Sequence, residues 1–251
     1  MTWSIIARDP DSGAMGAAVA SRFFAVGAMV PHVETGVGVV CTQALLNPFY
    51  GPQGLRMMRE SIAPQIALDA FMASDEVSAQ RQLHLMSADG SAAAFTGTEC
   101  VDHAGHRVGR DVSVAGNMLS GPEVLDATVE AFVENAGKPL AERLLRAIAS
   151  GDRAGGDKRG KQAAAIVVAG AETYADLDLR VDDHPEPIAE LWRLYQVAHD
   201  RHIPYRTALP TRADPVGVRN RDALEKRIEE WLSLHGKPDF SSFWSRDPWK
   251  E

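Results

Sequence analysis

Residues 2–21 read TWSIIARDPDSGAMGAAVAS, and this opening stretch decides the fold class. Trp3–Arg8 is apolar and rich in residues that favour β-strands, and Ala14–Ala20 resumes with small and branched residues. Between them, residues 9–13 (DPDSG) supply the Pro, Asp and Gly that a tight turn requires. The stretch therefore predicts a β-hairpin at the very start of the chain.

Further elements follow in runs of one kind. The sequence predicts strands at residues 36–43 (GVGVVCTQ), 81–87 and 91–96 around an Asp89-Gly90 turn, 111–118, 163–169 and 177–181. It predicts helices at residues 54–60, 63–74, 122–135, 139–149 and 187–201. Runs of strands followed by runs of helices favour a layered α+β architecture over an alternating βαβ fold.

The composition changes after His202. Residues 203–220 contain three prolines and little periodicity, which is typical of a linker or a long loop, whereas residues 222–234 regain a helical pattern. The tail, residues 240–251, carries four aromatic side chains. An exposed aromatic patch usually marks an interface, so we expect a homo-oligomer, with a flexible tail as the competing interpretation. We divide the chain into a domain at residues 1–202 and an extension at residues 203–251.

Composition and charge exclude several classes of function. The 251 residues are 45% hydrophobic and 24% charged, which is ordinary for a globular protein, and the net charge of −8 argues against nucleic acid as a partner. Cys41 and Cys100 are expected to be free thiols, typical of a reducing compartment, although a disulfide stays open. With no leader pattern or long apolar run, we expect a cytoplasmic protein without a membrane partner.

The second residue offers a specific chemistry. Methionine is normally trimmed when a small residue such as Thr2 follows it, and trimming would leave a free α-amine on a threonine. That amine has a reference pKa of about 7.7–8.0, so part of it is neutral near pH 7 and can take the proton of the threonine hydroxyl. A hydroxyl beside a base is an activated nucleophile, and a predicted first strand would hold it in place.

Five ordered segments of the chain resemble a known family. They are residues 2–21, residues 36–55 (GVGVVCTQALLNPFYGPQGL), residues 113–121 (SVAGNMLSG), residues 155–164 (GGDKRGKQAA) and residues 179–194 (LRVDDHPEPIAELWRL). Together they resemble the bacterial and archaeal domain-of-unknown-function family ten-twenty-eight, grouped with the N-terminal-nucleophile (Ntn) hydrolases. The resemblance implies a four-layer αββα sandwich of two antiparallel sheets. It covers about the first 200 residues and names no substrate.

The resemblance also implies the first candidate site residues. In the superfamily the nucleophile is an N-terminal Thr, Ser or Cys, and Thr2 is the matching position. Asn117, at a predicted strand end, is a candidate oxyanion donor or simply a turn residue. The glycine-rich loop at residues 155–160 is similar in style to the loop around the terminal amine in proteasome-like members. Within it, Asp157 is a candidate to orient the amine and Arg159 to contact substrate, unless the loop is merely solvated.

Polar residues at the ends of three predicted strands complete the candidate site. Each could line a cleft, because buried polar groups need partners, or could serve only the local structure. Ser4 lies two residues after Thr2 and therefore points to the same sheet face. The remaining candidates for substrate contact are Ser21, Arg22, Thr42, Gln43 and Asn47.

Other kinds of site have weaker support. His103 and His106 stand close together, but three or four convergent ligands are needed for a metal, so we expect neither a metal nor a cofactor. No nucleotide-binding glycine motif or G-x-S-x-G elbow occurs. Two hypotheses therefore stand: an Ntn amidohydrolase acting on a small amide or peptide-like substrate, and an inactive scaffold or small-molecule binding protein of the same fold.

Overall fold

The computed structural model describes residues 2–236. The chain divides into two compact units, residues 1–191 and residues 192–251. The aromatic tail at residues 240–251, on which the expectation of a homo-oligomer rests, lies outside the described residues. The boundary between the units comes earlier in the chain than the composition change after His202.

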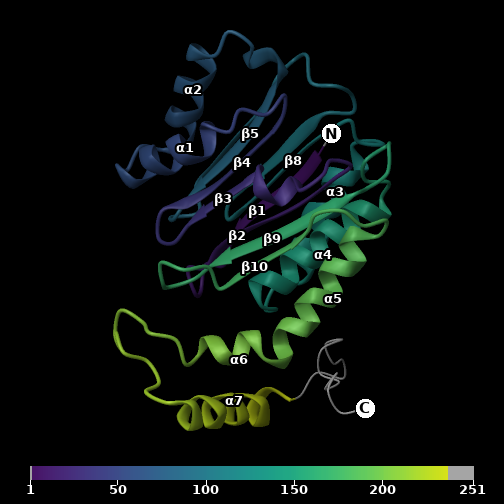
Figure 1. The fold of residues 1–251 in the computed structure, drawn as a ribbon. Helices are drawn as coiled ribbons and strands as arrows, with labels where there is room; N and C mark the ends of the chain where they lie inside the picture. Colours follow the sequence, from purple (N-terminus) through teal and green to yellow (C-terminus); the bar gives the residue numbers. More distant parts are fainter. Residues whose placement is uncertain (1, 237–251) are drawn as a thin grey trace. The chain divides into compact units, whose positions relative to one another are not determined.

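The first unit contains two antiparallel sheets (Figure 1). The larger has six strands in the order β10-β9-β2-β1-β8-β7, and the smaller has four in the order β3-β4-β5-β6. The strands of the larger sheet are β1 (Thr2–Arg8), β2 (Met15–Ser21), β7 (Gly105–Gly109), β8 (Val112–Asn117), β9 (Ala163–Ala169) and β10 (Leu177–Val181). Those of the smaller sheet are β3 (Pro31–Glu34), β4 (Gly38–Ala44), β5 (Arg81–Ser87) and β6 (Ala92–Thr96).

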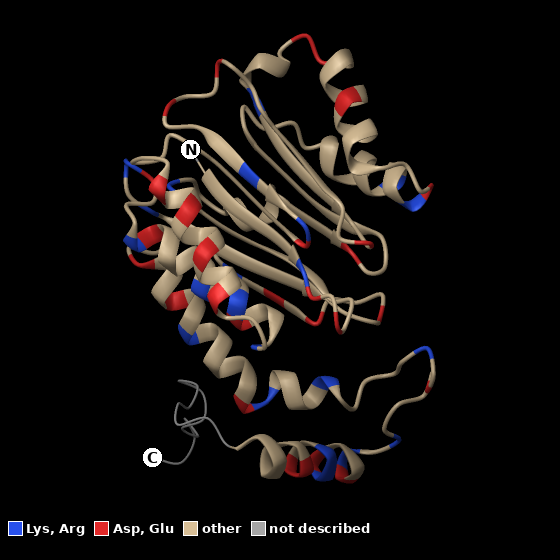
Figure 2. Ribbon diagram, turned by 180° about the vertical axis from the view of Figure 1, so that it is seen from behind, with Lys and Arg blue, Asp and Glu red and all other residues tan. Residues whose placement is uncertain are grey.

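Helices cover the outer face of each sheet (Figure 1). On the smaller sheet lie α1 (Tyr50–Arg59) and α2 (Pro64–Ser74), and on the larger lie α3 (Glu123–Glu134) and α4 (Leu140–Arg153). Two 3-10 turns, Val26–Ala28 and Ser78–Gln80, lie in the connections. Figure 2 shows that charged residues gather on helices, loops and strand ends, whereas the sheets are mostly uncharged.

The two inner faces of the sheets pack against each other. Ile6, Ala17 and Val19 of the larger sheet meet Val39 and Met86 of the smaller one in one buried cluster. Cys41 belongs to the same cluster, and burial raises the pKa of its thiol. Both cysteines are free, and Cys100 is only partly buried.

Alternation along β1 decides which side chains face the other sheet. Trp3 points toward the helices, because a Cβ added to Gly151 of α4 would lie 2.9 Å from its Nε1 atom. Ser4 points the other way and hydrogen-bonds Gln43 of the smaller sheet. Thr2 therefore shares the inner face with Ser4, as the strand period of two predicts.

The second unit is helical. Helix α5 (Pro187–Asp200) runs across the boundary at Leu191, and α6 (His202–Arg206) and α7 (Arg221–His235) follow. The N-terminus of α7 is capped by Asn220, whose Oδ1 accepts the backbone N–H of Ala223 at 2.9 Å. Within residues 2–236, no helix has both the length and the apolar character needed to cross a bilayer.

The predicted hairpins at residues 2–21 and 81–96 are confirmed, as are the mixed α+β class and two antiparallel sheets. Strands β3 and β7 were missed, and α6 lies in the segment expected to be a loop. The helix predicted at residues 54–60 begins earlier, at Tyr50, so that Gly51 and Pro52 lie in the first turn of α1. Proline is tolerated there, since the first N–H groups of a helix have no helical partner.

Candidate active site

Thr2 begins the central strand β1, between β2 and β8. The register places it directly opposite Asn117 of β8, and its Oγ1 donates a hydrogen bond to Ser21 Oγ, at the end of β2, over 3.1 Å. Thr2 is 6% exposed. The ends of two neighbouring strands therefore surround the hydroxyl that the sequence singled out.

The loop at residues 155–160 passes across this end of the sheet. Asp157 pairs with Leu119, just beyond β8, and its Oδ2 accepts the backbone N–H of Arg22, just beyond β2, at 3.0 Å. Because β1 lies between β2 and β8, the loop crosses level with Thr2. Of the predicted site residues, the structure thus brings Thr2, Ser21, Arg22, Asp157 and Arg159 to one sheet end.

Asp157 is a buried carboxylate held by several donors. Its side chain is fully buried, and Oδ1 accepts the backbone N–H of Arg159 at 2.7 Å. The Arg159 guanidinium also donates to Oδ2 at 3.3 Å, so one cation balances the buried charge. Arg22 and Arg159 each donate to the backbone carbonyl of the other. Such charge-assisted hydrogen bonds fix the carboxylate in place beside Ser21.

Glycine is required where this loop leaves α4. Gly155 has φ +119°, and a Cβ there would lie 2.1 Å from Ser120 Oγ. Gly160 has φ +97°, also in the region that L side chains rarely adopt. The glycines that suggested a functional loop in the sequence therefore have a demonstrable backbone role.

The side chain of Asn117 is buried and hydrogen-bonded within the protein. Its Nδ2 donates to Gln82 Oε1 at 2.8 Å and lies 3.5 Å from the carbonyl oxygen of Thr2. The shorter of these contacts, with Gln82, joins Asn117 to the smaller sheet. Asn117 would have to leave Gln82 before it could stabilise an oxyanion.

Ser4 and Gln43 also lie inside, between the sheets. Ser4 Oγ donates to Gln43 Oε1 at 2.7 Å and is 2.9 Å from Nε2 of His84, whose Nδ1 is 3.1 Å from Ser113 Oγ. Both predicted residues are fully buried and bonded within the protein. Burial, assisted by the nearby His106, lowers the pKa of His84 to about 3, so its imidazole is neutral.

Thr42 and Asn47 shape the connection from β4 to α1. Thr42 Oγ1 donates to the carbonyl oxygen of Asn47 at 3.3 Å, and Asn47 Oδ1 accepts the backbone N–H of Phe49 at 3.1 Å. These are local turn contacts of the kind that Asn commonly makes. The structure gives both residues a role in the turn.

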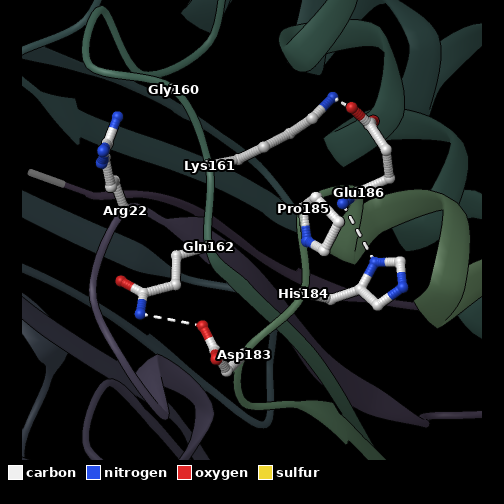
Figure 3. Close-up of a pocket in the computed structure, with 8 residues that line it drawn as sticks. All are labelled: Arg22, Gly160, Lys161, Gln162, Asp183, His184, Pro185 and Glu186. Carbon is white, nitrogen blue, oxygen red and sulfur yellow. Dashed lines mark hydrogen bonds and ion pairs between the residues drawn. The ribbon is translucent and has the colours of Figure 1, made fainter.

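A pocket opens beside the loop (Figure 3). Its volume of about 570 Å³ lies within the range of small-molecule sites. It is lined by Arg22, Gly160, Lys161, Gln162, Asp183, His184, Pro185 and Glu186. Lys161 binds Asp152 and Glu186, at 2.6 and 2.8 Å, and Gln162 donates to Asp183 at 3.0 Å. The guanidinium of Arg22 donates to the backbone carbonyl of Arg159 and carries a positive charge into this space.

A metal has no obvious place in this arrangement. In the part of the chain from residue 2 to residue 236, no three His, Cys, Asp or Glu side chains converge as a metal requires. His106 instead contacts Thr96 Oγ1 through its Nδ1, at 2.9 Å.

Comparison with known proteins identifies the family. A model described as a family of unknown function, DUF1028, matches residues 2–191. The chain belongs to the DUF1028 family. Its fold matches the crystal structure of a DUF1028 protein from Silicibacter pomeroyi, with a TM-score of 0.80 and 33% identity over 87% of this chain and 99% of that one.

Other comparisons add little. A Yersinia bercovieri protein named Anbu (ancestral beta-subunit) aligns at a TM-score of 0.38 and 12% identity, over 77% of this chain and 92% of that one, which is too low to support an inference. No curated protein matches the sequence. The DUF1028 match ends where the first compact unit ends, so all the candidate site residues lie in the segment shared with the family.

Two interior residues of this DUF1028 protein were not predicted. Gln82 and His84 are both fully buried and bond to residues of the other sheet. The alternation of apolar and polar residues along β5 was visible in the sequence, and it places these two on one face. The polar face of an alternating strand usually meets water, whereas here it meets the second sheet.

Proposed function

We propose that this DUF1028 protein is an Ntn amidohydrolase with the four-layer αββα fold of that superfamily. Its substrate would be a small amide or peptide-like molecule, and Thr2 would be the nucleophile after Met1 is removed. One observation carries the proposal: the hydroxyl of Thr2, a partner hydroxyl on Ser21 and the buried carboxylate of Asp157 gather at one end of the central strand.

The reaction follows from the groups present. The free α-amine of Thr2 takes the hydroxyl proton while Oγ1 attacks the substrate carbonyl carbon. The C–N bond then breaks, the proton passes from the ammonium to the leaving amine, and a threonine ester remains. Water, deprotonated by the same amine, attacks this ester, releases the carboxylic acid and restores the hydroxyl.

The neighbouring residues take supporting roles. The Thr2 hydroxyl donates to Ser21 Oγ, which holds Oγ1 at the strand end. For attack, the hydroxyl turns this hydrogen from Ser21 to the free α-amine. Asp157 places a negative charge at the strand end, where the α-ammonium forms. Backbone N–H groups are the simplest oxyanion donors, because Asn117 is bonded to Gln82. Arg22 and the pocket beside it are where the rest of the substrate would bind.

Binding without catalysis is the second candidate function. It is favoured by the low exposure of Thr2, 6%, because a nucleophile has to be reached by its substrate. Removal of Met1, which catalysis requires, takes away the residue that precedes Thr2 and frees its amine. The two functions therefore differ first in the state of the N-terminus.

The intact mass of untagged protein tests the first requirement. A mass lacking one methionine is expected, and such protein should form a covalent ester with a small β-lactone, whose ring opens on attack by Thr2 Oγ1. Thr2→Ala should abolish this adduct, whereas Thr98→Ala, a matched change at an exposed threonine, should not. Retention of Met1, or an adduct of equal yield in Thr2→Ala, would exclude the mechanism and favour the binding function.

A further inference from the structure

Two side-chain amides converge on the main chain of Thr2. The Nε2 atom of Gln43, on the smaller sheet, and the Nδ2 atom of Asn117, on the larger sheet, each lie 3.5 Å from the carbonyl oxygen of Thr2. These distances are long for hydrogen bonds, which are typically about 2.7–3.2 Å. What aims the two amides at this oxygen must therefore be another, stronger contact.

Gln82 supplies that contact. Its Oε1 atom accepts from both amides, at 2.8 Å from Gln43 and 2.8 Å from Asn117. Its Nε2 atom donates to the carbonyl oxygens of Gly116, at 2.8 Å, and Gly105, at 3.0 Å, and to Thr96 Oγ1 at 2.9 Å. One end of the amide meets only donors and the other only acceptors, which fixes its orientation. The two hydrogens on Nε2 serve three acceptors, so one hydrogen is shared between two of them. Gln82 is 0% exposed, so no water competes for them.

The backbone beside both amides is also constrained. Gln43 is followed by Ala44 at φ +66°, and Asn117 is followed by Met118 at φ +52°. Residues other than glycine rarely adopt this conformation, which is strained and persists only where the surroundings hold it. A strained residue therefore stands at the end of β4 and another directly after the end of β8.

We propose that Gln82 is a positioning residue for Thr2. By orienting Gln43 and Asn117, it fixes the carbonyl of Thr2 between the sheets, and thereby the direction in which the Cα of Thr2 carries its hydroxyl and α-amine. This inference rests on the proposed function for its catalytic consequence, but the positioning itself is a property of the folded chain.

The test compares Gln82→Leu with wild type and with Ser113→Ala. Leucine keeps the approximate volume of Gln82 but removes all the hydrogen bonds of its amide. Ser113→Ala also disturbs the inter-sheet network, because it removes a buried hydrogen bond, but that bond goes to His84 and not to Thr2. In NMR relaxation, the methyl order parameter of Thr2 should fall in Gln82→Leu and stay at the wild-type value in Ser113→Ala.

The β-lactone gives a second readout on protein lacking Met1. The maximal labelling rate, kinact, should fall about ten- to hundredfold in Gln82→Leu, since small misplacements of a reacting group are costly, with KI unchanged. A partly unfolded variant would instead show a reduced labelled fraction at an unchanged rate. An unchanged Thr2 methyl order parameter in folded Gln82→Leu would overturn the proposal, and so would an unchanged kinact.

The two proposals can fail separately. If wild type without Met1 is not labelled, the hydrolase function fails, while the order parameters still decide whether Gln82 positions Thr2.

If Gln82→Leu does not fold, Gln82→Glu takes its place, because it keeps an acceptor oxygen for Gln43 and Asn117 but loses donors to the backbone. It should hold the Thr2 methyl more rigidly at low pH, where the carboxyl is protonated, than at neutral pH. A Thr2 order parameter that does not change with pH would overturn the proposal.

Discussion

His84 is a titratable residue that is fully buried between the two sheets. Its ring lies between the hydroxyls of Ser4 and Ser113. Since the Ser4 hydroxyl donates to Gln43, Nε2 of His84 carries the proton and Nδ1 accepts from Ser113. The imidazole is therefore neutral, with every polar atom partnered. Protonation of the imidazole is unfavourable, because the added charge would be buried away from water and close to His106.

We predict that His84 makes the fold sensitive to acid. Its pKa is lowered from 6.5 to about 3, so between these values the unfolded chain binds a proton that the folded chain does not. Stability contributed by neutral His84 is therefore present above pH 6.5 and is lost as pH falls toward 3. By pH 4.5 the loss should reach about 2–3 kcal/mol in the free energy of unfolding, measured by urea denaturation.

The control for this prediction is His84→Gln, which is uncharged at every pH. It should be less stable at pH 7, because its contacts fit less well, but should lose less stability than wild type between pH 7 and pH 4.5. Parallel stability–pH curves for the two proteins would show that other groups, such as paired carboxylates, account for acid sensitivity.

At the scale of elements, the end of α4 depends on its contact with Trp3. The sequence predicted that this helix ends at residue 149, but the helix continues to Arg153. Gly151 therefore lies within the helix. Its position leaves no room for a side chain, because an added Cβ would be 2.3 Å from Thr128 Oγ1 and 2.9 Å from Trp3 Nε1. Glycine thus permits α4 to approach both α3 and β1 closely.

Gly151→Ala should therefore destabilise the protein, although alanine favours helices by about 1 kcal/mol over glycine. Overpacking a dense core costs about 1–3 kcal/mol, and neither an indole nor a buried hydroxyl can move far here. Thermal unfolding followed by circular dichroism measures the change, with Ser150→Ala, one residue earlier, as the matched control. A higher melting temperature for Gly151→Ala than for wild type would mean that the helix can shift to make room.

Elements with strong local signals were predictable, and those that depend on partners were not. The two hairpins carry turn residues at the right spacing, so their strands were found. Strand β3, Pro31–Glu34, is short and partly exposed, and it exists because it pairs with β4. Strand β7 likewise depends on β8. Both strands are short and only partly buried, so neither carries the clear alternation of apolar and polar residues that marks a strand in the sequence.

The same distinction holds for the candidate site. Thr2 and Ser21 follow from hairpin register, which the sequence encodes locally, and the glycine-rich loop containing Asp157 was recognised by resemblance. Gln82 was missed because an alternating strand does not reveal what its polar face meets. Its contacts with Gly105, Gly116 and Asn117 exist only once the two sheets are stacked.

For the whole molecule, the division into two units leads to a prediction about truncation. The buried clusters between the sheets and beneath α1 and α2 are formed by residues of the first unit alone. A chain ending after Asp200, the last residue of α5, should therefore still unfold cooperatively. Calorimetry should give a melting temperature within a few degrees of the full chain, whereas a chain ending after Ala175, which lacks β10, should not unfold cooperatively.

The pairing register of β1 with β8 determines both how Trp3 packs and which way the Thr2 hydroxyl points. A slip of one residue against β8 would turn Trp3 into the space between the sheets and Thr2 toward the helices, and an indole and a hydroxyl cannot exchange places. Every chain that packs its tryptophan correctly thus aims its first hydroxyl in one direction. During evolution, a single substitution at position 2 can abolish whatever that hydroxyl does while sparing the fold. To redirect it, the hydrophobic interior of the whole larger sheet would have to be rebuilt.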